Sequence, residues 1–369
     1  MIFFFGLSLI YILFFIWCSY QWKRIIIPNP TEVLPMKFTV LIPVRNEAST
    51  LPLLLRDLEK QSIDLASFEV IVIDDNSEDN TMTLVRELLP SLVIDCQLLE
   101  LGAKGLEGKK NAITLGVANA KHEIIIATDG DCRMGIHWLA AYSRAFSNQK
   151  TQMVSGPVCM NANTFFEQLQ VLEFSALIGI GAATLSSGNP TMCNGANMGY
   201  RKAVFEEVNG YAGNEGIASG DDEFLLQKVF KNHPEGISFL KDAEALVTTK
   251  AKGNLKEFLN QRIRWSSKWK HHKSVFIWIG AMIVFFNYVF VYGALAWSAY
   301  DIIWLPSVLC VIILRWLAMS RFLNKTATFS GIRYSHFMTF FLEIIYPVFV
   351  LFLGIASIFG KYSWKGRRY

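Results

Sequence analysis

The feature that most constrains this chain is the length and position of its uncharged segments. Residues 2–21 carry no charged side chain, and neither do residues 275–300. Two further apolar segments, 302–320 and 337–360, carry one charged residue each. A helix of roughly 20 apolar residues is long enough to cross the hydrocarbon core of a bilayer. The sequence therefore predicts one N-terminal and about three C-terminal transmembrane or membrane-embedded helices.

The residues that flank the first segment indicate its orientation. Lys23 and Arg24 follow the apolar run, whereas a secretory signal peptide carries its positive charge before that run. Positive residues beside a span favour the cytoplasmic side of the membrane. We therefore expect residues 1–24 to be an uncleaved transmembrane anchor whose C-terminal end lies in the cytoplasm.

The last apolar segment leaves two arrangements open. A full span there would place the basic tail KYSWKGRRY outside the cell, against the preference of positive residues for the cytoplasm. Either this segment is re-entrant, with a kink at Pro347, or one segment of the C-terminal membrane region, residues 275–369, lies in the membrane interface.

The composition is that of a chain with both membrane segments and a polar domain. The chain is 52% hydrophobic yet 18% charged, with a net charge of +4. The basic residues cluster near the apolar segments, which indicates a membrane surface as the anionic partner and not a nucleic acid. The six cysteines are scattered, with no CxxC pair, so we expect free thiols in a reducing compartment and not a zinc site.

Residues 36–257 have the pattern of a soluble α/β domain. Short β-branched runs in KFTVLIPV (37–44), FEVIVIDDNS (68–77) and HEIIIATDGDC (122–132) predict buried strands. Segments with helical spacing separate them. Strands that are continuous apolar runs and alternate with helices indicate a mostly parallel sheet covered on both faces, as in a Rossmann-like nucleotide-binding core.

A polar cluster ends each of these predicted strands. The clusters are Arg45-Asn46-Glu47, Asp74-Asp75-Asn76 and Asp129-Gly130-Asp131. In parallel α/β sheets, ligands bind outside the carboxyl ends of the strands. We therefore expect the three clusters to line one pocket.

Asp129 and Asp131 are candidates for a divalent metal site. Two carboxylates one residue apart can both reach a hard cation, and Mg²⁺ or Mn²⁺ suits carboxylates combined with substrate phosphates. An ordinary turn would also use Asp and Gly. The buried strand before this motif and the acids on two neighbouring strands favour the metal.

Two further stretches carry candidate ligand-binding residues. Asp74 and Asp75 can accept hydrogen bonds from a nucleotide base or ribose, although a simple turn would also account for them. Lys109 follows Gly105 and Gly108 in a loop before a helix. A lysine there can meet phosphate, or it can remain solvated.

The acids Asp221, Asp222 and Glu223 open a predicted helix after Gly220. Acids in a first helical turn are stabilised by the helix dipole, so capping alone is one explanation. Like charges packed together raise the pKa of one another, which would suit a general base.

The segment FLNQRIRWSSKWKHHK (258–273) joins this domain to the second apolar segment. Cations and tryptophans beside a membrane span are typical of an interfacial anchor. The residues that fit this role are Lys268, Trp269, Lys270 and Lys273.

Seven motifs in one order resemble those of the family 2 glycosyltransferases, which are membrane-attached inverting enzymes with the GT-A fold. The motifs are IPVRNE (42–47), VIDDNSEDNT (72–81), GKKNAITLG (108–116), DGD (129–131), GANMGYRKAVFEEVNGY (195–211), GDDEFLL (220–226) and QRIRW (261–265). Each motif alone is weak, but the ordered set covers about residues 38–270. The QxxRW element is similar to that of cellulose, chitin and hyaluronan synthases and of ceramide glucosyltransferases.

The resemblance implies a role for residues on the nucleotide side. Pro43, Glu47 and Asp75 look like the nucleotide-binding groups, with Asp74 beside them. Lys109 is similar to a lysine that meets the nucleotide diphosphate. One position departs from the family pattern, since an arginine stands at residue 45 where many members have tyrosine, and the partner that stacks on the base is therefore open.

The resemblance also implies the reacting groups. Asp129 and Asp131 look like the DxD carboxylates that bind the metal and the diphosphate. Asp222 falls where the family has its general base, preceded here by Asp221 where the family usually has glutamate. The residues that match QxxRW are Gln261, Arg264 and Trp265.

Together these positions imply an inverting hexosyl transfer from a nucleotide-diphosphate sugar. Asp222 would take the proton of the acceptor hydroxyl, while the metal and Arg264 would stabilise the charge on the departing diphosphate. Alternatives remain open: a processive polysaccharide synthase of the same family, a non-catalytic membrane subunit that binds nucleotide sugars, and a nucleotidyltransferase that acts on lipid phosphates.

The implied partners are a nucleotide-sugar donor, most simply a UDP-sugar, a lipid or lipid-linked acceptor, and the membrane. We expect an integral protein of a bacterial inner (plasma) membrane with its catalytic domain in the cytoplasm.

Overall fold

The computed structural model describes residues 1–29, 34–214, 220–267, 275–359, 363–365 and 367–368. The chain forms two compact units. The sheet unit comprises Arg24–Ala162 and Gly181–Ala251, and the helical unit comprises Met1–Lys23, Asn163–Ile180 and Lys252–Tyr369. Each unit is described by itself.

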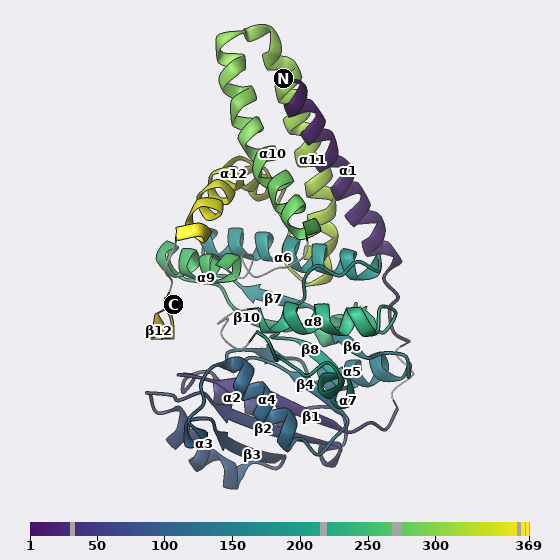
Figure 1. Cartoon of the computed structure of the whole chain (residues 1–369), viewed down its shortest axis with the longest axis vertical. Coiled ribbons are helices and arrows are strands. Elements are labelled where there is room, and N and C mark those ends of the chain that lie inside the picture. Colours follow the sequence, from purple (N-terminus) through teal and green to yellow (C-terminus); the bar gives the residue numbers. More distant parts are fainter. Residues whose placement is uncertain (30–33, 215–219, 268–274, 360–362, 366, 369) are drawn as a thin grey trace. The chain divides into compact units, whose positions relative to one another are not determined.

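A seven-stranded sheet is the framework of the sheet unit (Figure 1). In spatial order its strands are β3 (Asp95–Glu100), β2 (Phe68–Asp74), β1 (Phe38–Val44), β4 (Ile124–Ala127), β8 (Met198–Arg201), β6 (Met153–Ser155) and β9 (Ile237–Phe239). The first four strands are parallel, and β6 is parallel to β9. Only β8 is antiparallel to its neighbours β4 and β6 among the described strands of this sheet. The predicted mostly parallel sheet is therefore confirmed.

Helices pack beside this sheet (Figure 1). They are α2 (Leu51–Glu59), α3 (Thr81–Leu88), α4 (Lys109–Asn119), α5 (Trp138–Phe146), α7 (Lys202–Glu207) and α8 (Asp221–Asn232). Every residue of β1 and β2 is buried, as continuous apolar runs predict. Helix α4 approaches the sheet closely at Gly116, where an added Cβ would lie 2.9 Å from Leu41 Cδ2. Since α4 begins at Lys109, this contact also fixes the position of a candidate site residue.

A second, three-stranded sheet in the same unit has the order β5 (Arg133–Met134), β10 (Val247–Lys250), β7 (Val158–Asn161). Strand β5 begins two residues after Asp131, so the Asp-Gly-Asp motif connects the large sheet to the small one. Short 3₁₀ turns complete the described secondary structure: η1 (Leu65–Ser67), η2 (Leu89–Ser91), η3 (Gly102–Lys104), η4 (Ala243–Ala245) and η6 (Ile302–Trp304). No disulfide joins the six cysteines, all of which lie in described segments.

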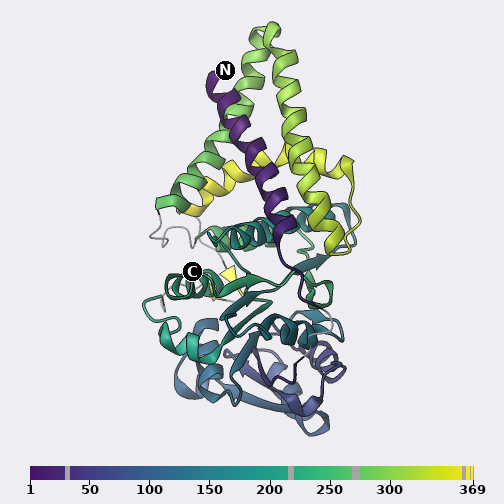
Figure 2. The same cartoon turned by 90° about the vertical axis from the view of Figure 1, so that its right-hand side faces the viewer.

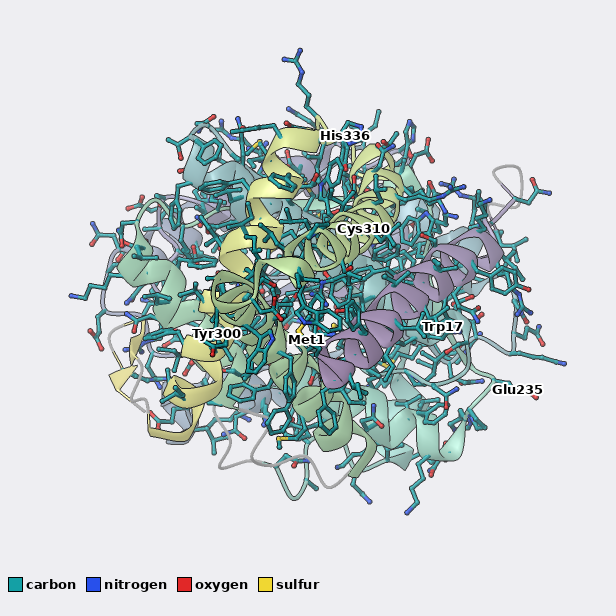
Figure 3. The ribbon with its side chains drawn as sticks, turned by 90° about the horizontal axis from the view of Figure 1, so that it is seen from above. Met1, Trp17, Glu235, Tyr300, Cys310 and His336 are labelled. Carbon is teal, nitrogen blue, oxygen red and sulfur yellow. The ribbon has the colours of Figure 1, made fainter. Side chains whose placement is uncertain are left out.

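The helical unit contains long apolar helices and the shorter, more polar helix α9 (Figure 2). They are α1 (Ile2–Arg24), the first part of α6 (Phe165–Ser186), α9 (Leu255–Ser267), α10 (Val275–Tyr300), α11 (Leu305–Phe329) and α12 (His336–Phe359). Figure 3 marks Trp17 on α1, Tyr300 at the end of α10, Cys310 on α11 and His336 at the start of α12. A short hairpin of β11 (Ser363–Trp364) and β12 (Arg367–Arg368) follows.

Five of the described helices are long and apolar enough to cross a membrane, and the predicted N-terminal and C-terminal ones are among them. The fifth is α6, which the sequence analysis counted with the soluble domain. Its apolar stretch is 67% buried within the protein, against 17–28% in the other four. Helix α6 therefore covers its apolar residues mostly with protein, which the linear pattern does not reveal.

Phe4 of α1, Val291 of α10 and Val308 of α11 form a buried apolar cluster near one end of these helices. Helix α12 packs against α9, α10 and α11, and it continues through Pro347 to Phe359. The two arrangements expected for this last apolar segment both remain predictions.

A polar network links the long helices across the interior of the helical unit. Arg315 of α11 lies 3.2 Å from Glu343 of α12 and 3.4 Å from the Ser8 hydroxyl of α1, and it also donates to Asn287 of α10. All four side chains are buried. Charged groups in apolar helices are stable only when they face partners, so this network fixes how the four helices meet.

Candidate active site

The strand order brings the three polar clusters to adjacent positions, because β2, β1 and β4 are neighbours in the sheet. Gly130 shows how closely they meet. An added Cβ at Gly130 would lie 2.8 Å from Val44 Cγ1 and 3.2 Å from Glu47 Cγ. The Asp-Gly-Asp turn therefore rests directly on the end of β1, and only glycine fits there without a shift.

Pro43 occupies a central strand, where a missing backbone N–H would normally break a ladder of hydrogen bonds. Along β1, Val44 accepts a hydrogen bond from Asp75 N on the β2 side, while Leu41 accepts one from Thr128 N on the β4 side. Residues alternate between the two sides, so Pro43 faces the β4 side. Pairing with β4 ends at Leu41, so no strand partner is lost.

Asp75 joins the end of β2 to the loop before α4. Its Oδ1 accepts a hydrogen bond from Gly108 N at 2.7 Å. Asp74 instead faces its own turn, where Oδ2 accepts from Ser77 N at 3.1 Å. The other oxygen of Asp74 is buried with no hydrogen-bond partner among the described residues. A donor group of a ligand would satisfy it.

Arg45 stabilises the turn that follows β2. Its buried guanidinium donates to Asp75 O at 2.9 Å and forms an ion pair with Glu78 at 2.6 Å. Arg45 stands where many family members have tyrosine, and in this chain its side chain stabilises the turn after β2.

Lys109 is the cation at the centre of the site. Its Nζ lies 2.7 Å from Asp129 Oδ1 and 3.2 Å from Asp221 Oδ2. Burial opposes the charge on Lys109, but the two carboxylates outweigh it and raise the pKa of this lysine above its usual range. Burial likewise opposes the charge on Asp221, yet Lys109 lowers the pKa of that carboxyl. Asp221 thus stays ionised and paired, which makes it a poor proton acceptor.

Asp222 is held differently from its neighbour. Its Oδ2 accepts from Gly195 N at 3.1 Å and its Oδ1 from Glu223 N at 2.8 Å. Both Asp221 and Asp222 are half-buried. Two backbone donors thus orient the Asp222 carboxylate. Of the two acids, Asp222 is the better candidate base.

The donor set fits a divalent metal that arrives with a substrate. Asp129 is 38% exposed, and Asp131 Oδ2 accepts from Thr249 Oγ1 at 3.2 Å. No group of three or more His, Cys, Asp or Glu within the described residues is arranged to hold a metal ion. Mg²⁺ and Mn²⁺ often bind through one or two carboxylates and complete their shell with phosphate oxygens and water. Asp129 and Asp131 match that requirement.

The QRIRW segment lies on α9 of the helical unit, with Gln261, Arg264 and Trp265 all half-buried. The second residue of the segment, Arg262, is 3% exposed. The sequence analysis gave Arg262 no role. The helical spacing of Phe258, Arg262 and Trp265, at four and three residues, would have placed them on one face. The anchor residues Lys268, Trp269, Lys270 and Lys273 lie outside the described residues.

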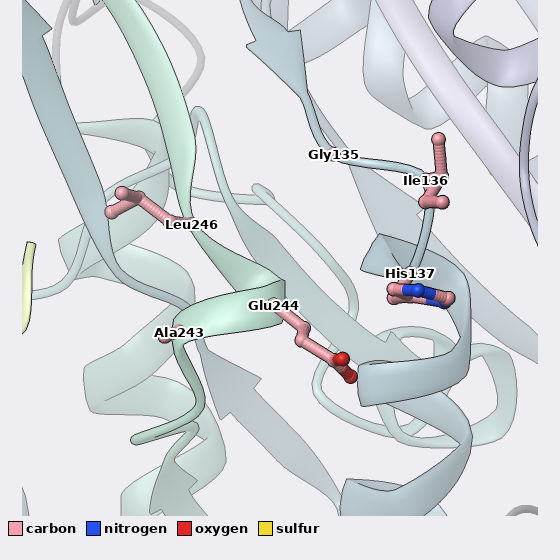
Figure 4. Close-up of a pocket in the computed structure, with 6 residues that line it drawn as sticks. All are labelled: Gly135, Ile136, His137, Ala243, Glu244 and Leu246. Atoms are coloured by element: carbon pink, nitrogen blue, oxygen red, sulfur yellow. The ribbon is translucent and has the colours of Figure 1, made fainter. Parts of the chain in front are cut away.

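A separate pocket of about 350 Å³ opens in the sheet unit (Figure 4). Its lining residues are Gly135, Ile136, His137, Ala243, Glu244 and Leu246. It adjoins the end of β5 at Met134, whereas Asp131 precedes the other end of that strand. Glu244 is paired with Arg144 at 2.5 Å, and His137 Nδ1 lies 2.8 Å from Ser62 Oγ, so both titratable side chains of this lining already have a partner.

Comparison with known proteins identifies the family. The sequence model of "Glycosyl transferase family 2" matches residues 39–208, and that of "Glycosyl transferase family group 2" matches residues 124–356, more than half of the chain. A mannosyltransferase from Pyrobaculum calidifontis, solved with GDP-Man and Mn²⁺, has the same fold, with a TM-score of 0.58, 18% identity and 96% of each chain covered.

Two relatives were found by sequence. Glycosyltransferase AglE of Haloferax volcanii is 28% identical to this chain, over 35% of this chain and 41% of its own length. Poly-β-1,6-N-acetyl-D-glucosamine synthase of Staphylococcus epidermidis is 23% identical, over 56% of this chain and 48% of its own length. The chain thus matches less than half the length of these relatives. The family model and the GT-A neighbour agree with the ordered motifs of the sequence and with the mixed α/β sheet. The chain belongs to the family 2 glycosyltransferases.

Proposed function

We propose that this protein is an inverting glycosyltransferase that moves a hexose from a nucleotide-diphosphate sugar to a lipid or lipid-linked acceptor at the cytoplasmic face of a membrane. The observation that carries the proposal is the arrangement around Lys109, which bridges Asp129 and Asp221 beside the oriented carboxylate of Asp222. A phosphate-binding cation, a metal-binding acid and a candidate base meet there within one unit.

The nucleotide would bind at the carboxyl ends of β1 and β2. Pro43 is the second-last residue of β1 and Glu47 follows the strand, while Asp74 offers a buried oxygen that lacks a partner among the described residues. Asp75 ties this edge to Gly108, so nucleotide binding there would also position Lys109 at the start of α4. Acids at such strand ends accept hydrogen bonds from ribose.

The diphosphate would lie between Lys109 and the Asp129–Asp131 pair. When bound, Mg²⁺ or Mn²⁺ supplies positive charge that neutralises the departing diphosphate. Lys109 can move from carboxylate to phosphate, since both are anionic oxygens at hydrogen-bond distance from its flexible side chain. For Arg264 of α9, stabilisation of the charge on the leaving group stays a role implied by the sequence resemblance.

Asp222 would take the proton from the acceptor hydroxyl. Its two backbone donors orient the carboxylate, whereas Asp221 is already engaged in an ion pair with Lys109. A direct attack from the face opposite the diphosphate inverts the anomeric carbon.

The membrane-embedded acceptor is supported by the five apolar helices of the described chain. A second candidate function is processive polysaccharide synthesis. It is favoured by the partial match to the S. epidermidis synthase, which is named for a polymer product.

The test is nucleotide release by the purified full chain in lipid nanodiscs. UDP-glucose, UDP-GlcNAc, UDP-galactose and GDP-mannose are each supplied with Mg²⁺, Mn²⁺ or EDTA, with and without extracted membrane lipids. Asp222→Asn is expected to lower release by about 10²–10⁴-fold, the range for loss of a general base. Asp95→Asn, which changes an exposed acid at the amino end of β3, is the matched control.

The products separate the alternatives. A single added hexose on a lipid supports the proposal, while a ladder of products from one donor supports the processive synthase. Release that is unaffected by Asp222→Asn places the base elsewhere. No release with any donor leaves a binding subunit as the better description.

A further inference from the structure

Arg262 is the second residue of the QRIRW segment and contacts residues before and after it in the chain. Its Nη1 donates to Gln261 Oε1 at 2.8 Å, and its Nη2 pairs with Glu173 of α6. The guanidinium carbon lies 4.2 Å from the Trp265 ring centroid and 4.8 Å from that of Phe258. Phe174, next to Glu173, packs on Trp265 at 5.8 Å. Gln261 and Trp265 are thus both positioned by a residue that the motif does not include.

The buried ion pair explains why Arg262 stays in place. The side chains of Arg262 and Glu173 are 3% and 6% exposed, and both belong to the helical unit. Leaving one of two buried charges without its partner is strongly unfavourable. Arginine also stacks on aromatic rings without losing its hydrogen bonds. Helix α6, which sequence analysis did not single out, supplies the anion.

The contact also fixes the orientation of the Gln261 amide. A guanidinium has only donors, so it can bond only to the carbonyl oxygen of the amide. The NH₂ group of Gln261 must then point away from Arg262. Among the described residues it has no hydrogen-bond partner. The segment therefore presents two N–H donors in a fixed direction.

We propose that Arg262 is a positioning residue that holds Gln261 as a hydrogen-bond donor toward a ligand rich in acceptor oxygens, such as a sugar or a phosphate of the reacting molecules. The inference rests on the proposed function, because the ligand is taken to be the donor or the acceptor of the transfer. Arg262 itself acts through Gln261 and Trp265 and contacts no ligand.

The first test removes the donors and keeps the contact. Gln261→Glu still offers an oxygen of the same shape to Arg262, but it has no N–H to present. We expect the unfolding temperature of the full chain in nanodiscs to be unchanged, and nucleotide release to fall about tenfold or more, as when a site loses a fixed hydrogen bond. A rise in donor KM identifies the donor as the ligand. A rise in the half-saturating concentration of added membrane lipid, at unchanged donor KM, identifies the acceptor.

The second test exchanges the positions of the positive and negative residues in the Arg262–Glu173 ion pair. Glu173→Arg and Arg262→Glu alone each leave buried like charges and lower the unfolding temperature. The double variant restores the pair, so the unfolding temperature should recover. The carboxylate then at position 262 can only accept, which turns the Gln261 amide around, and release should stay at least tenfold below wild type. Exchange of the exposed pair by Arg86→Glu with Glu100→Arg is the matched control and should leave release unchanged.

The outcomes are distinct. Recovery of both unfolding temperature and release in the double variant shows that the pair is only structural and overturns the inference, as does full release by Gln261→Glu. If the double variant does not fold, Gln261→Glu decides alone. A wild-type protein that releases no nucleotide from any of the four donors overturns the proposed function, and the inference with it.

Discussion

Both units contain a cation paired with a carboxylate, but the two pairs differ in exposure. In the helical unit, the side chains of Arg315 and Glu343 are 1% and 4% exposed. In the sheet unit, those of Lys109 and its partner Asp129 are 20% and 38% exposed. A buried pair cannot be taken over by solvent or ligand, whereas a pair at the edge of a site can exchange partners. Exposure thus separates ion pairs that hold a fold from those that can bind a substrate.

The largest expected effect follows from breaking the buried network. Arg315→Leu leaves Glu343 charged among apolar helices and removes donors from Asn287 and Ser8. We expect a loss of about 3–5 kcal/mol in the free energy of unfolding, the range for one orphaned member of a buried pair. Thermal unfolding of the full chain in nanodiscs measures it.

Two variants control this prediction. Arg321→Leu removes an exposed arginine from the same helix and should change the midpoint little. Arg315→Leu combined with Glu343→Leu should be less harmful than Arg315→Leu alone, because no buried charge remains. Equal midpoints for Arg315→Leu and wild type would contradict a structural role.

The second effect concerns the exchangeable pair. Lys109→Met removes the cation from Asp129 and Asp221, and under the proposed function it also removes a phosphate contact. We expect nucleotide release to fall about 10²–10³-fold, as when one stabilising donor of a transition state is deleted. Initial rates with each donor measure it, with Lys104→Met as the control at an exposed position. A fall in stability with unchanged rates would place Lys109 with the structural pairs instead.

The third effect tests how closely the Asp-Gly-Asp turn must lie against β1. In Gly130→Ala, the new Cβ would meet Val44 and Glu47, so the turn must shift by a few tenths of an ångström or more. We expect kcat/KM to fall about 10–100-fold, since small displacements of positioned groups slow catalysis. Gly135→Ala is the matched control, because nothing lies within 4 Å of a Cβ added there. Equal kcat/KM for both variants would show that the close contact at Gly130 is not needed for catalysis.

The sequence predicted the strands of the sheet better than it predicted contacts between side chains that are distant in the chain. Strands β1, β2 and β4 are continuous buried runs that end in polar clusters, so the local pattern predicted both these strands and the position of the clusters after them. The pairing of Lys109 with Asp221 was not predictable, because it depends on where the tertiary fold places α8. Local periodicity carries no information about such distant contacts.

Helix α6 and Arg262 were missed for a related reason. Helix α6 contains acids, and it lies between segments of α/β pattern, so its apolar character was assigned to a soluble core. Arg262 lies beside the better recognised Arg264, and only the structure reveals that Glu173 of α6 neutralises the former. In both cases the partner that gives the residue its role is more than eighty residues away in the sequence.

The smallest expected effect concerns an ion pair that is exposed to solvent. Arg86 and Glu100 form an ion pair of 2.5 Å with side chains 59% and 44% exposed. Such pairs contribute about 0–1 kcal/mol, because water already solvates both charges and ordering the side chains costs entropy. Glu100→Gln should therefore change the unfolding midpoint by no more than a degree or two, roughly the shift that a few tenths of a kcal/mol produces. Added salt should abolish even that difference, since exposed charges are screened. A salt-independent loss as large as that of Arg315→Leu would mean that the distance between charges, and not their exposure, decides what an ion pair contributes in this protein.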